Sequence, residues 1–546
     1  MAHFINEPEN SVTEAIDGLI AASGGRLVRL DGYPYVRVVI RSDWDKSQVA
    51  LISGGGSGHE PAHAGFVGAG MLTAAVCGDV FASPSVDAVL AGILAVTGPA
   101  GCLLIVKNYT GDRLNFGLAA ARARSLGHKV ELVIVGDDIA LPDLLQPRGV
   151  AGTLFVHKIA GAMAREGADL KTIAGAARRT AEGTKSFGMS LDTCEVPGSP
   201  KEDRIPVGKI ELGLGIHGEP GVRQADFKNV RTALMSVCDS LAATMIDGPH
   251  VVLVNNLGGT SNLEMSVIVH ELIQSHLGNK ISHIVGPATM MGSLGMHGVS
   301  ISTYPATPQE LELLVAPVPL NTWPGVFSIA PVQTIPLSSK LEPMNFPASV
   351  NLLLSDMLSD CCKTLIASRT ELNALDAKSG DGDTGSTVAK AAETLLAAAE
   401  QLPFAEPSQL YQALAQILGQ AMGGSSGILL SIYFAATGNA LAHGRPTIEA
   451  LKLGLEEIMN IGGAKRGDRT MIDALEPALD SLIYGIEDAA VAARKGANLT
   501  STMLNAGAGR ASYVSADQLS GHVDPGAEAV ARVFECLAEN SLKKLP

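Results

Sequence analysis

Aromatic and charged residues are scarce in this 546-residue sequence, at 4% and 17% of the chain. The formal net charge of −15 disfavours general binding to nucleic acid, because that affinity comes largely from Lys and Arg side chains that neutralise phosphates. The seven cysteines include no C-x-x-C pair, and such a scattered set is typical of reduced thiols in a cytoplasmic protein. We therefore expect no nucleic-acid partner and no framework of disulfides.

Features of secreted and membrane proteins are absent as well. The N-terminal segment MAHFINEPEN has neither the basic n-region nor the apolar h-region of a signal peptide. The most apolar helical stretch, residues 427–442, is shorter than the ~20 residues that span a bilayer. We expect a soluble, cytoplasmic protein with no membrane partner, in which residues 427–442 form a buried helix.

Glycine is abundant, at 60 residues, and the first part of the chain alternates apolar runs with helical segments. Residues 48–54, 101–108 and 129–138 are near-continuous apolar runs, which are typical of buried parallel strands. Residues 112–127 have helical spacing and end in glycine. This pattern predicts an α/β domain in which helices cover a parallel sheet.

A second α/β unit is predicted further along the chain, with strands at residues 209–221, 250–259 and 280–288. The turn-rich residues 190–206 join it to the first unit. We expect the two units to be subdomains of one body rather than independent folds.

The predicted chain is therefore multidomain. The N-terminal α/β domain covers residues 1–335, with subdomains of about 1–190 and 191–335. Residues 336–348 are rich in proline and lack periodicity, which predicts a linker. From residue 349 to 546, Ala and Leu dominate and amphipathic spacing recurs, which predicts an all-α domain of seven or eight helices.

A glycine-rich loop, LISGGGSGHEPAHAG at residues 51–65, begins within the first predicted strand. A phosphate-binding P-loop would end in Gly-Lys-Ser/Thr, but His59 and Glu60 occupy that position. The spacing does not match the dinucleotide motif G-x-G-x-x-G either. We expect this loop to approach a small ligand closely, since glycine has no side chain to keep the backbone away.

Three aspartates lie close together in the all-α domain: Asp376, Asp381 and Asp383, with Gly380 and Gly382 between them. Hard cations bind several carboxylate oxygens, and glycines let a loop curl until alternate carboxylates converge. The loop leads into a helix whose free N–H groups can bind an anion. We predict a site for Mg²⁺ and phosphate; the alternative is a D-G-D turn that only caps the helix.

Further glycine-containing loops join helices in this domain at residues 422–430, 462–473, 507–514 and 524–530. Arg469 and Arg510 in these loops are candidates for phosphate contacts. Each loop alone is explained by ordinary helix-end chemistry. Their number favours a nucleotide site at one end of a helical barrel or bundle.

Seven segments together carry a resemblance to a known family. In the N-terminal half they are SGGGSGHEPAHAGFVGAGMLTAAVCGDVFASPS (53–85), LLIVKNYTGDRLNFGLA (103–119) and ELGLGIHGEPG (211–221). In the C-terminal half they are LNALDAKSGDGDTGST (372–387), MGGSSG (422–427), GDRTMIDAL (467–475) and AGRASY (508–513). The chain resembles the single-chain, ATP-dependent dihydroxyacetone (glycerone) kinases over essentially its whole length. The resemblance implies an α/β substrate domain, a nucleotide-binding helical barrel, and phosphorylation of dihydroxyacetone by ATP.

For the substrate domain, the resemblance implies specific roles in binding and catalysis. The residues implied to hold the ketone are Gly56, Ser57, Gly58, His59, Lys107 and Asp112. His217 is implied to bond to the carbonyl carbon as a hemiaminal, which requires a neutral imidazole with a nitrogen lone pair. Asp112 is the candidate base for the hydroxyl that attacks the γ-phosphoryl group of ATP, and His59 hydrogen-bonds or protonates the carbonyl oxygen.

For the helical domain, the resemblance implies that Asp376, Asp381 and Asp383 hold two Mg²⁺ ions, which bind the phosphates of ATP. The residues implied to surround the nucleotide are Thr384, Gly385, Ser386, Thr387, Ser425, Ser426, Gly462, Thr470, Met471, Arg510, Asp524, Pro525 and Gly526. The family also implies a homodimer in which the two kinds of domain face each other across subunits.

Four alternatives stay open. A kinase for a related ketose such as erythrulose would differ in pocket size, which the sequence does not show. Cyclisation of FAD to a flavin nucleotide, an activity of relatives in the family, would use the same metal ions. A carbonyl-sensing regulatory binding protein would lack the nucleotide domain or its carboxylates. A kinase that uses a phosphoprotein donor is usually built from separate subunits.

Overall fold

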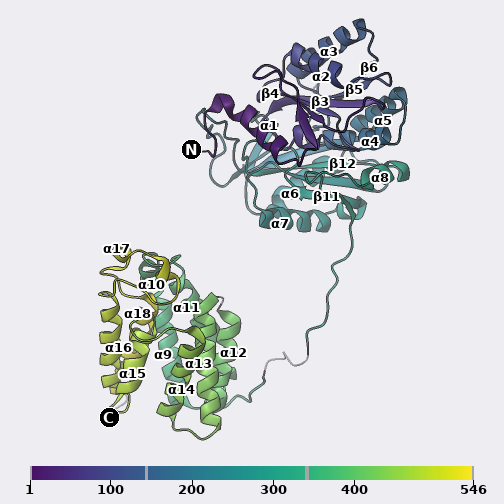
Figure 1. Ribbon diagram of the computed structural model, residues 1–546. Coiled ribbons are helices and arrows are strands. Elements are labelled where there is room, and N and C mark those ends of the chain that lie inside the picture. The colour runs from purple at the N-terminus through teal and green to yellow at the C-terminus, as the bar shows by residue number, and fades with distance from the viewer. Residues whose placement is uncertain (1–2, 142–145, 339–343, 423, 544–546) are drawn as a thin grey trace. The chain divides into compact units, whose positions relative to one another are not determined.

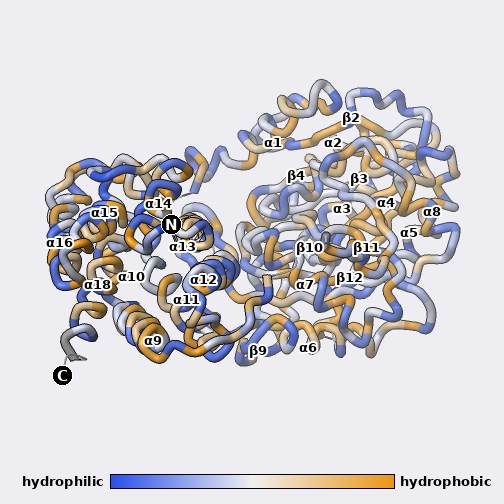
Figure 2. The backbone as a smooth tube through the Cα atoms, turned by 90° about the horizontal axis from the view of Figure 1, so that it is seen from below, coloured by the Kyte–Doolittle hydropathy of each residue, from blue (hydrophilic) through white to orange (hydrophobic). Residues whose placement is uncertain are grey.

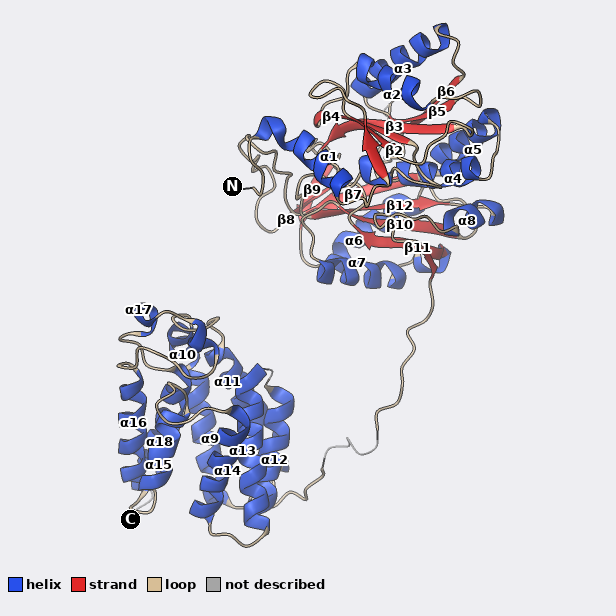
Figure 3. Cartoon of the chain, in the orientation of Figure 1, coloured by secondary structure: helices blue, strands red, loops and turns tan. Residues whose placement is uncertain are grey.

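The computed structural model describes residues 3–141, 146–338, 344–422 and 424–543. The chain forms two compact units, Met1–Gln333 and Thr334–Pro546 (Figure 1). Colouring by secondary structure shows that the sheets belong to the first unit and that the second is built from helices (Figure 3). The described residues of the predicted linker contain neither helix nor strand.

The first sheet has the strand order β1-β2-β4-β3-β5-β6. Its strands are β1 (Leu27–Arg29), β2 (Val38–Arg41), β3 (Ala50–Ser57), β4 (Ala74–Val80), β5 (Cys102–Lys107) and β6 (Val130–Val135). Strands β4, β3, β5 and β6 are parallel, whereas β1 and β2 add antiparallel pairs at one edge. The three strands predicted from apolar runs are thus confirmed as β3, β5 and β6.

The second sheet has the order β13-β11-β10-β12-β7-β8-β9. Its strands are β7 (Lys185–Ser190), β8 (Lys209–Leu212), β9 (Arg223–Asp226), β10 (His250–Asn256), β11 (Ile281–Ala288), β12 (Gly298–Tyr304) and β13 (Val326–Ser328). Only the pair β10–β11 is parallel, and the other pairs are antiparallel. This sheet is therefore mainly antiparallel, unlike the first. Strand β7 belongs to this sheet although it precedes residue 191.

Helices cover and separate the two sheets. They are α1 (Ser11–Ala21), α2 (Val86–Val96), α3 (Thr110–Ser125), α4 (Thr153–Arg165), α5 (Leu170–Gly183), α6 (Val230–Ala242), α7 (Asn262–Gln274) and α8 (Pro308–Val315). Helices α2 and α3 cover the outer face of the first sheet, α4 and α5 pack between the sheets, and α6 and α7 cover the second (Figure 3). Figure 2 shows hydrophobic segments around β10, β11 and β12, and the longest hydrophobic run among these strands is the buried residues 251–254 of β10.

Strand β3 is glycine-rich because β4 runs very close to it. A Cβ added at Gly54 would lie 2.1 Å from the carbonyl oxygen of Val76 in β4. We expect Gly54→Ala to destabilise the N-terminal unit by about 3 kcal/mol, since the two strands would have to move apart. Urea unfolding followed by tryptophan fluorescence measures this, because Trp44 and Trp323 both lie in this unit.

Gly18→Ala is the matched control for that substitution. Gly18 is exposed inside α1, and nothing lies within 4 Å of the position its Cβ would take. Alanine is favoured over glycine within a helix, so we expect a small gain of stability, up to about 1 kcal/mol. Equal unfolding midpoints for the two variants would contradict the close strand contact at Gly54.

The second unit is a closed ring of helices. They are α9 (Leu352–Ala367), α10 (Arg369–Asp376), α11 (Thr384–Ala398), α12 (Pro407–Ala421), α13 (Gly424–Ala442), α14 (Thr447–Gly462), α15 (Ile472–Ser481), α16 (Ile486–Thr500), α17 (Ala516–Leu519) and α18 (Pro525–Lys543). The long helices pack in sequence from α9 to α18, and α18 packs back against α9. The predicted all-α barrel is therefore confirmed. Across the part of the chain that the structure describes, we find no helix with the length and apolarity to cross a membrane.

Candidate active site

His59 lies directly after β3, in the glycine-rich loop, and its side chain is fully buried. Its Nδ1 lies 2.9 Å from the carbonyl oxygen of Gly292. Because a carbonyl only accepts hydrogen bonds, Nδ1 carries the proton. Burial, together with the charges of Lys107 and His217, places the pKa of His59 well below its usual value. The ring is therefore neutral, and its Nε2 is a hydrogen-bond acceptor.

His217 lies in the loop after β8, which ends at Leu212 although the sequence predicted a strand as far as residue 221. The His217 ring centroid is 4.8 Å from that of His59 and 5.3 Å from that of Phe81. Tyr109 is closer still, with its ring edge-on at 4.4 Å. Two histidines from distant parts of the sequence thus meet beside two aromatic rings.

Lys107 and Asp112 come from neighbouring ends of β5 and α3. Lys107 is the last residue of β5, and Asp112 lies in the first turn of α3, where the helix dipole favours a carboxylate. The hydroxyl of Ser83 donates a hydrogen bond to the Asp112 carboxylate. Burial lowers the pKa of Lys107, and the charges of Asp112 and Glu219 oppose that shift. Both side chains face Gly55, whose Cβ position lies 3.3 Å from Asp112 Oδ2 and 3.6 Å from Lys107 Nζ.

Three buried polar atoms around His217 have no hydrogen-bond partner within the described residues. They are Nε2 of His59, Nζ of Lys107 and the hydroxyl of Tyr109. Such groups are costly to bury unpaired and are usually satisfied by a ligand or by water. Lys107 can donate, His59 Nε2 can accept and the Tyr109 hydroxyl can do either, so these residues suit a small molecule with both hydroxyl and carbonyl oxygens.

The other predicted residues of the glycine loop contact the protein itself. A Cβ at Gly56 would lie 2.6 Å from the backbone nitrogen of Ala82, and Gly58 has a φ of +98°. The Ser57 hydroxyl donates to the carbonyl of Gly78 at 2.8 Å. Close backbone packing thus accounts for glycine at position 56, and the positive φ together with the Phe81 ring accounts for glycine at position 58. The glycine that opens toward Lys107 and Asp112 is Gly55, which the sequence alone did not single out.

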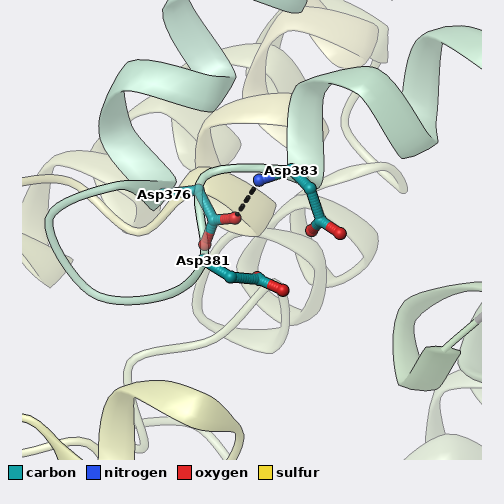
Figure 4. Close-up of side chains that lie close together, drawn as sticks. All are labelled: Asp376, Asp381 and Asp383. Atoms are coloured by element: carbon teal, nitrogen blue, oxygen red, sulfur yellow. Dashed lines mark hydrogen bonds between the residues drawn. The ribbon is translucent and has the colours of Figure 1, made fainter. Parts of the chain in front are cut away.

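The helical unit brings the three aspartates together. Their carboxylate oxygens lie within 4.8 Å of one another, with Asp376 buried and the other two exposed. Asp376 Oδ2 accepts the backbone N–H of Asp383 at 2.9 Å, which folds the loop back on itself (Figure 4). A Cβ at Gly380 would lie 2.3 Å from Asp376 Oδ1, so a larger residue there would displace this carboxylate. The loop ends at Thr384, where α11 begins.

Charge repulsion at this cluster fits a site for a hard cation. The pKa of Asp383 is raised by slight desolvation and by the negative charges of Asp381 and Asp376. The pKa of Asp381 is lowered by its ion pair with Arg510. Several carboxylate oxygens at one point are the ligand set that Mg²⁺ and Ca²⁺ prefer, and a helix start beside them suits a phosphate.

The loops predicted to bind the nucleotide connect helices at one end of the ring. Consecutive helices of an up-and-down ring run antiparallel, so alternate connections share one end. Arg510 reaches Asp381 across this end, and Arg469 donates to the carbonyl of His522 at 2.8 Å. Gly462 closes α14 beside the side chain of Leu429 in α13.

Several predicted nucleotide residues already have partners within the protein. The N–H of Thr470 donates to Asp473 at 2.8 Å, and Met471 lies 3.3 Å from the Cβ position of Gly526. Asp524 caps α18 by accepting the N–H of Ala527 at 2.8 Å, and burial raises its pKa to about 6. Helix capping therefore explains Asp524, and Pro525 is the first residue of that helix.

Backbone N–H groups at the start of α11 also have hydrogen-bond partners within the protein. The N–H of Thr384 donates to Asp376 at 3.1 Å, and that of Ser386 donates to Asn373 at 2.9 Å. Gly385 is buried, while Thr387 lies in the first turn. The backbone of Ser425 and Ser426 belongs to the first turn of α13, but their side chains lie outside the described part of the structure.

Sequence reasoning did not assign a role to four side chains of the ketone-side cluster. Phe81 and Tyr109 flank the His217 ring, Ser83 donates to Asp112, and Glu219 accepts from His217. All four lie inside the family motifs, which was the only signal available. Their contacts depend on how distant loops fold together.

Comparison with known proteins agrees with this two-part organisation. Residues 17–321 match the family model described as the Dak1 domain, and residues 378–539 match the DAK2 domain. A relative from Citrobacter freundii named dihydroxyacetone kinase is 48% identical over 549 residues, covering 99% of each chain. A mouse relative named triokinase/FMN cyclase is 40% identical over 574 residues, covering 98% of each chain.

A solved structure resembles the whole chain. The dihydroxyacetone kinase of C. freundii in complex with AMP-PNP and Mg²⁺ has a TM-score of 0.72 and 46% identity, covering 98% of this chain and 99% of that one. Each unit matches one of the two family models, and the relatives and this solved structure extend over both units. The chain therefore belongs to the dihydroxyacetone kinase family.

Proposed function

We propose that this protein transfers the γ-phosphoryl group of ATP to a terminal hydroxyl of dihydroxyacetone, which yields dihydroxyacetone phosphate. The observation that carries this proposal is the set of unpaired buried atoms around His217, from His59, Lys107 and Tyr109. A three-carbon hydroxyketone offers hydroxyl and carbonyl oxygens to these groups. The relatives and the AMP-PNP complex support ATP as the donor.

A covalent hemiaminal on His217 would give selectivity for ketones. A three-carbon substrate has little surface for selective binding, and a polyol such as glycerol has no carbonyl carbon to attack. The neutral His59 has an acceptor at Nε2, which suits a hydrogen bond from a hydroxyl of the bound substrate. An acceptor at Nε2 can neither donate a hydrogen bond to the carbonyl oxygen nor protonate it, so this geometry instead favours acceptance by His59 of a hydrogen bond from a substrate hydroxyl.

Asp112 is the proposed general base. We expect Asp112→Asn to lower kcat by ~10²–10⁴ while the protein stays folded, because an amide cannot accept the proton of the attacking hydroxyl. Steady-state kinetics with ATP and dihydroxyacetone measure the loss. Asp87→Asn is the control, since Asp87 also lies in the first turn of a helix but pairs with Arg122 at the surface. Normal turnover of Asp112→Asn would show that Asp112 is not the general base.

Asp376, Asp381 and Asp383 would hold two Mg²⁺ ions with the nucleotide. Bound Mg²⁺ neutralises charge on the phosphates, which is a main requirement of phosphoryl transfer. Beside them, the guanidinium of Arg510 would provide positive charge for phosphate oxygens. The remaining loop residues at this end of the ring would contact the nucleotide.

The substrate is tested by a screen of ATP-dependent phosphorylation. The panel contains dihydroxyacetone, glyceraldehyde, both erythrulose enantiomers and glycerol, with coupled ADP detection. We expect the highest kcat/KM with dihydroxyacetone and none measurable with glycerol. A preference for an erythrulose enantiomer would favour the related ketose kinase instead. FAD is a further arm of the screen, because the mouse relative is named triokinase/FMN cyclase.

We also propose that the protein is a homodimer, as the family resemblance implies. Light scattering during size-exclusion chromatography should then give twice the 56.4 kDa of one chain. A mass of one chain across the working concentration range would contradict this proposal without affecting the assigned reaction.

A further inference from the structure

Glu219 contacts His217 at two points in the loop after β8. One carboxylate oxygen, Oε2, accepts the backbone N–H of His217 at 2.9 Å, and the other, Oε1, lies 3.2 Å from ring Nδ1. The same carboxylate fills the space beside Gly215, where a Cβ would lie 2.1 Å from Oε2. The loop that carries His217 is therefore folded around this carboxylate.

The carboxylate determines which ring nitrogen of His217 holds the proton. An ionised carboxylate can only accept hydrogen bonds, so the nearby Nδ1 must carry a hydrogen. Burial opposes ionisation of Glu219, but hydrogen bonds from the ring and the backbone N–H of His217 hold its pKa below the usual value. A neutral imidazole with its proton on Nδ1 has its lone pair on Nε2.

Neighbouring rings restrict the orientation of the imidazole. Phe81 and Tyr109 both meet the His217 ring nearly edge-on, each with an interplanar angle of 78°. Rotation of the ring would break the contact of Nδ1 with Glu219 and disturb both aromatic contacts. The two nitrogens are therefore held in distinct environments, with Nδ1 beside the carboxylate.

We propose that Glu219 is a positioning residue for carbonyl addition: it holds His217 in the Nδ1–H tautomer and thereby makes Nε2 the atom that attacks the ketone. This inference rests on the proposed function, in which His217 binds the ketone covalently. Glu219 itself does not contact the ketone, and it acts through the imidazole.

The addition step balances with water as proton carrier. The Nε2 lone pair forms the C–N bond, and the π electron pair of the carbonyl moves to oxygen. The oxygen takes up one proton from solvent, and Nδ1 keeps its proton beside the Glu219 carboxylate. The product is a hemiaminal whose imidazolium ring carries one positive charge, and this charge is paired with the ionised carboxylate of Glu219.

The tautomer is measured directly on the full-length protein. With [¹⁵N]histidine labelling, ¹⁵N NMR shifts distinguish the Nδ1–H tautomer, the Nε2–H tautomer and the imidazolium, and His217→Ala assigns the signal. We expect the Nδ1–H form in the wild-type protein. The Nε2–H form would overturn the proposal without any need for a Glu219 variant.

Glu219→Gln tests the consequence for binding. A neutral amide can donate to Nδ1 as well as accept from it, so it no longer selects one tautomer. We expect the affinity for [2-¹³C]dihydroxyacetone, followed by the tetrahedral carbon signal of the adduct, to fall at least ~10-fold. Glu219→Asp, which keeps the carboxylate, should recover part of that loss.

Asp239→Asn is the matched control, because Asp239 lies 3.6 Å from Nε2 of the exposed His276 in the same unit. It should leave the adduct unchanged. Wild-type affinity and an unchanged tautomer in Glu219→Gln would overturn the positioning role while the hemiaminal stands. Absence of any adduct in the wild-type protein would instead refute the covalent part of the proposed function, and the tautomer measurement would still decide the role of Glu219.

Discussion

Replacing Asp381 by asparagine is expected to lower kcat by ~10²–10³ and to leave covalent ketone binding unchanged. The carboxylates of Asp376, Asp381 and Asp383 lie within 4.8 Å of one another, so the loss of one removes a charged ligand from the proposed Mg²⁺ site. Metal ions contribute several kcal/mol of charge stabilisation in the transition state, and each 1.36 kcal/mol is about tenfold in rate. The variant should also need a higher Mg²⁺ concentration for half-maximal rate.

Two measurements separate this effect from general damage to the enzyme. Steady-state kinetics across a Mg²⁺ titration report on the nucleotide site, while the ¹³C signal of the dihydroxyacetone adduct reports on the ketone site. Asp480→Asn is the control, since Asp480 is an exposed partner of Lys452 on the same unit. Near wild-type turnover of Asp381→Asn at low Mg²⁺ would remove this residue from the metal site.

The fold was predictable where the sequence signal is local. Buried parallel strands need apolar residues on both faces, so β3, β5 and β6 stand out as continuous runs. The same signal located β10 and β11 but not their neighbours in the sheet. Strand pairing depends on which distant segment lies alongside, as when β12 inserts antiparallel between β10 and β7.

The active site shows the same difference between local sequence signals and contacts between distant segments. Asp376, Asp381 and Asp383 are close in sequence, so a glycine-rich loop suffices to bring them together, and the sequence predicted this cluster directly. His59 and His217 approach only because loops of the two sheets meet, which spacing could not show. Their roles came from the family resemblance.

The partners of these histidines were harder to predict still. The tautomer of His59 depends on one carbonyl, that of Gly292, and the tautomer of His217 depends on one carboxylate. Gly55 and Gly56 are neighbours in sequence, but a Cβ would point toward Lys107 and Asp112 at Gly55 and toward the backbone of Ala82 at Gly56. Such atomic directions are set by the packed structure, and no motif encodes them separately.

His217→Ala is expected to abolish the dihydroxyacetone adduct in the full-length protein and to raise the KM for the ketone at least ~10-fold. The covalent bond supplies affinity that a three-carbon ligand cannot obtain from contacts alone, and tenfold corresponds to only about 1.4 kcal/mol. Residual phosphoryl transfer is expected, because the terminal hydroxyl reacts at a different atom from the carbonyl carbon. The preference for dihydroxyacetone over glycerol should therefore fall more than kcat does.

An adduct that persists in His217→Ala would transfer the covalent role to another nucleophile, and Lys107, buried and without a hydrogen-bond partner among the described residues, would be the first to test.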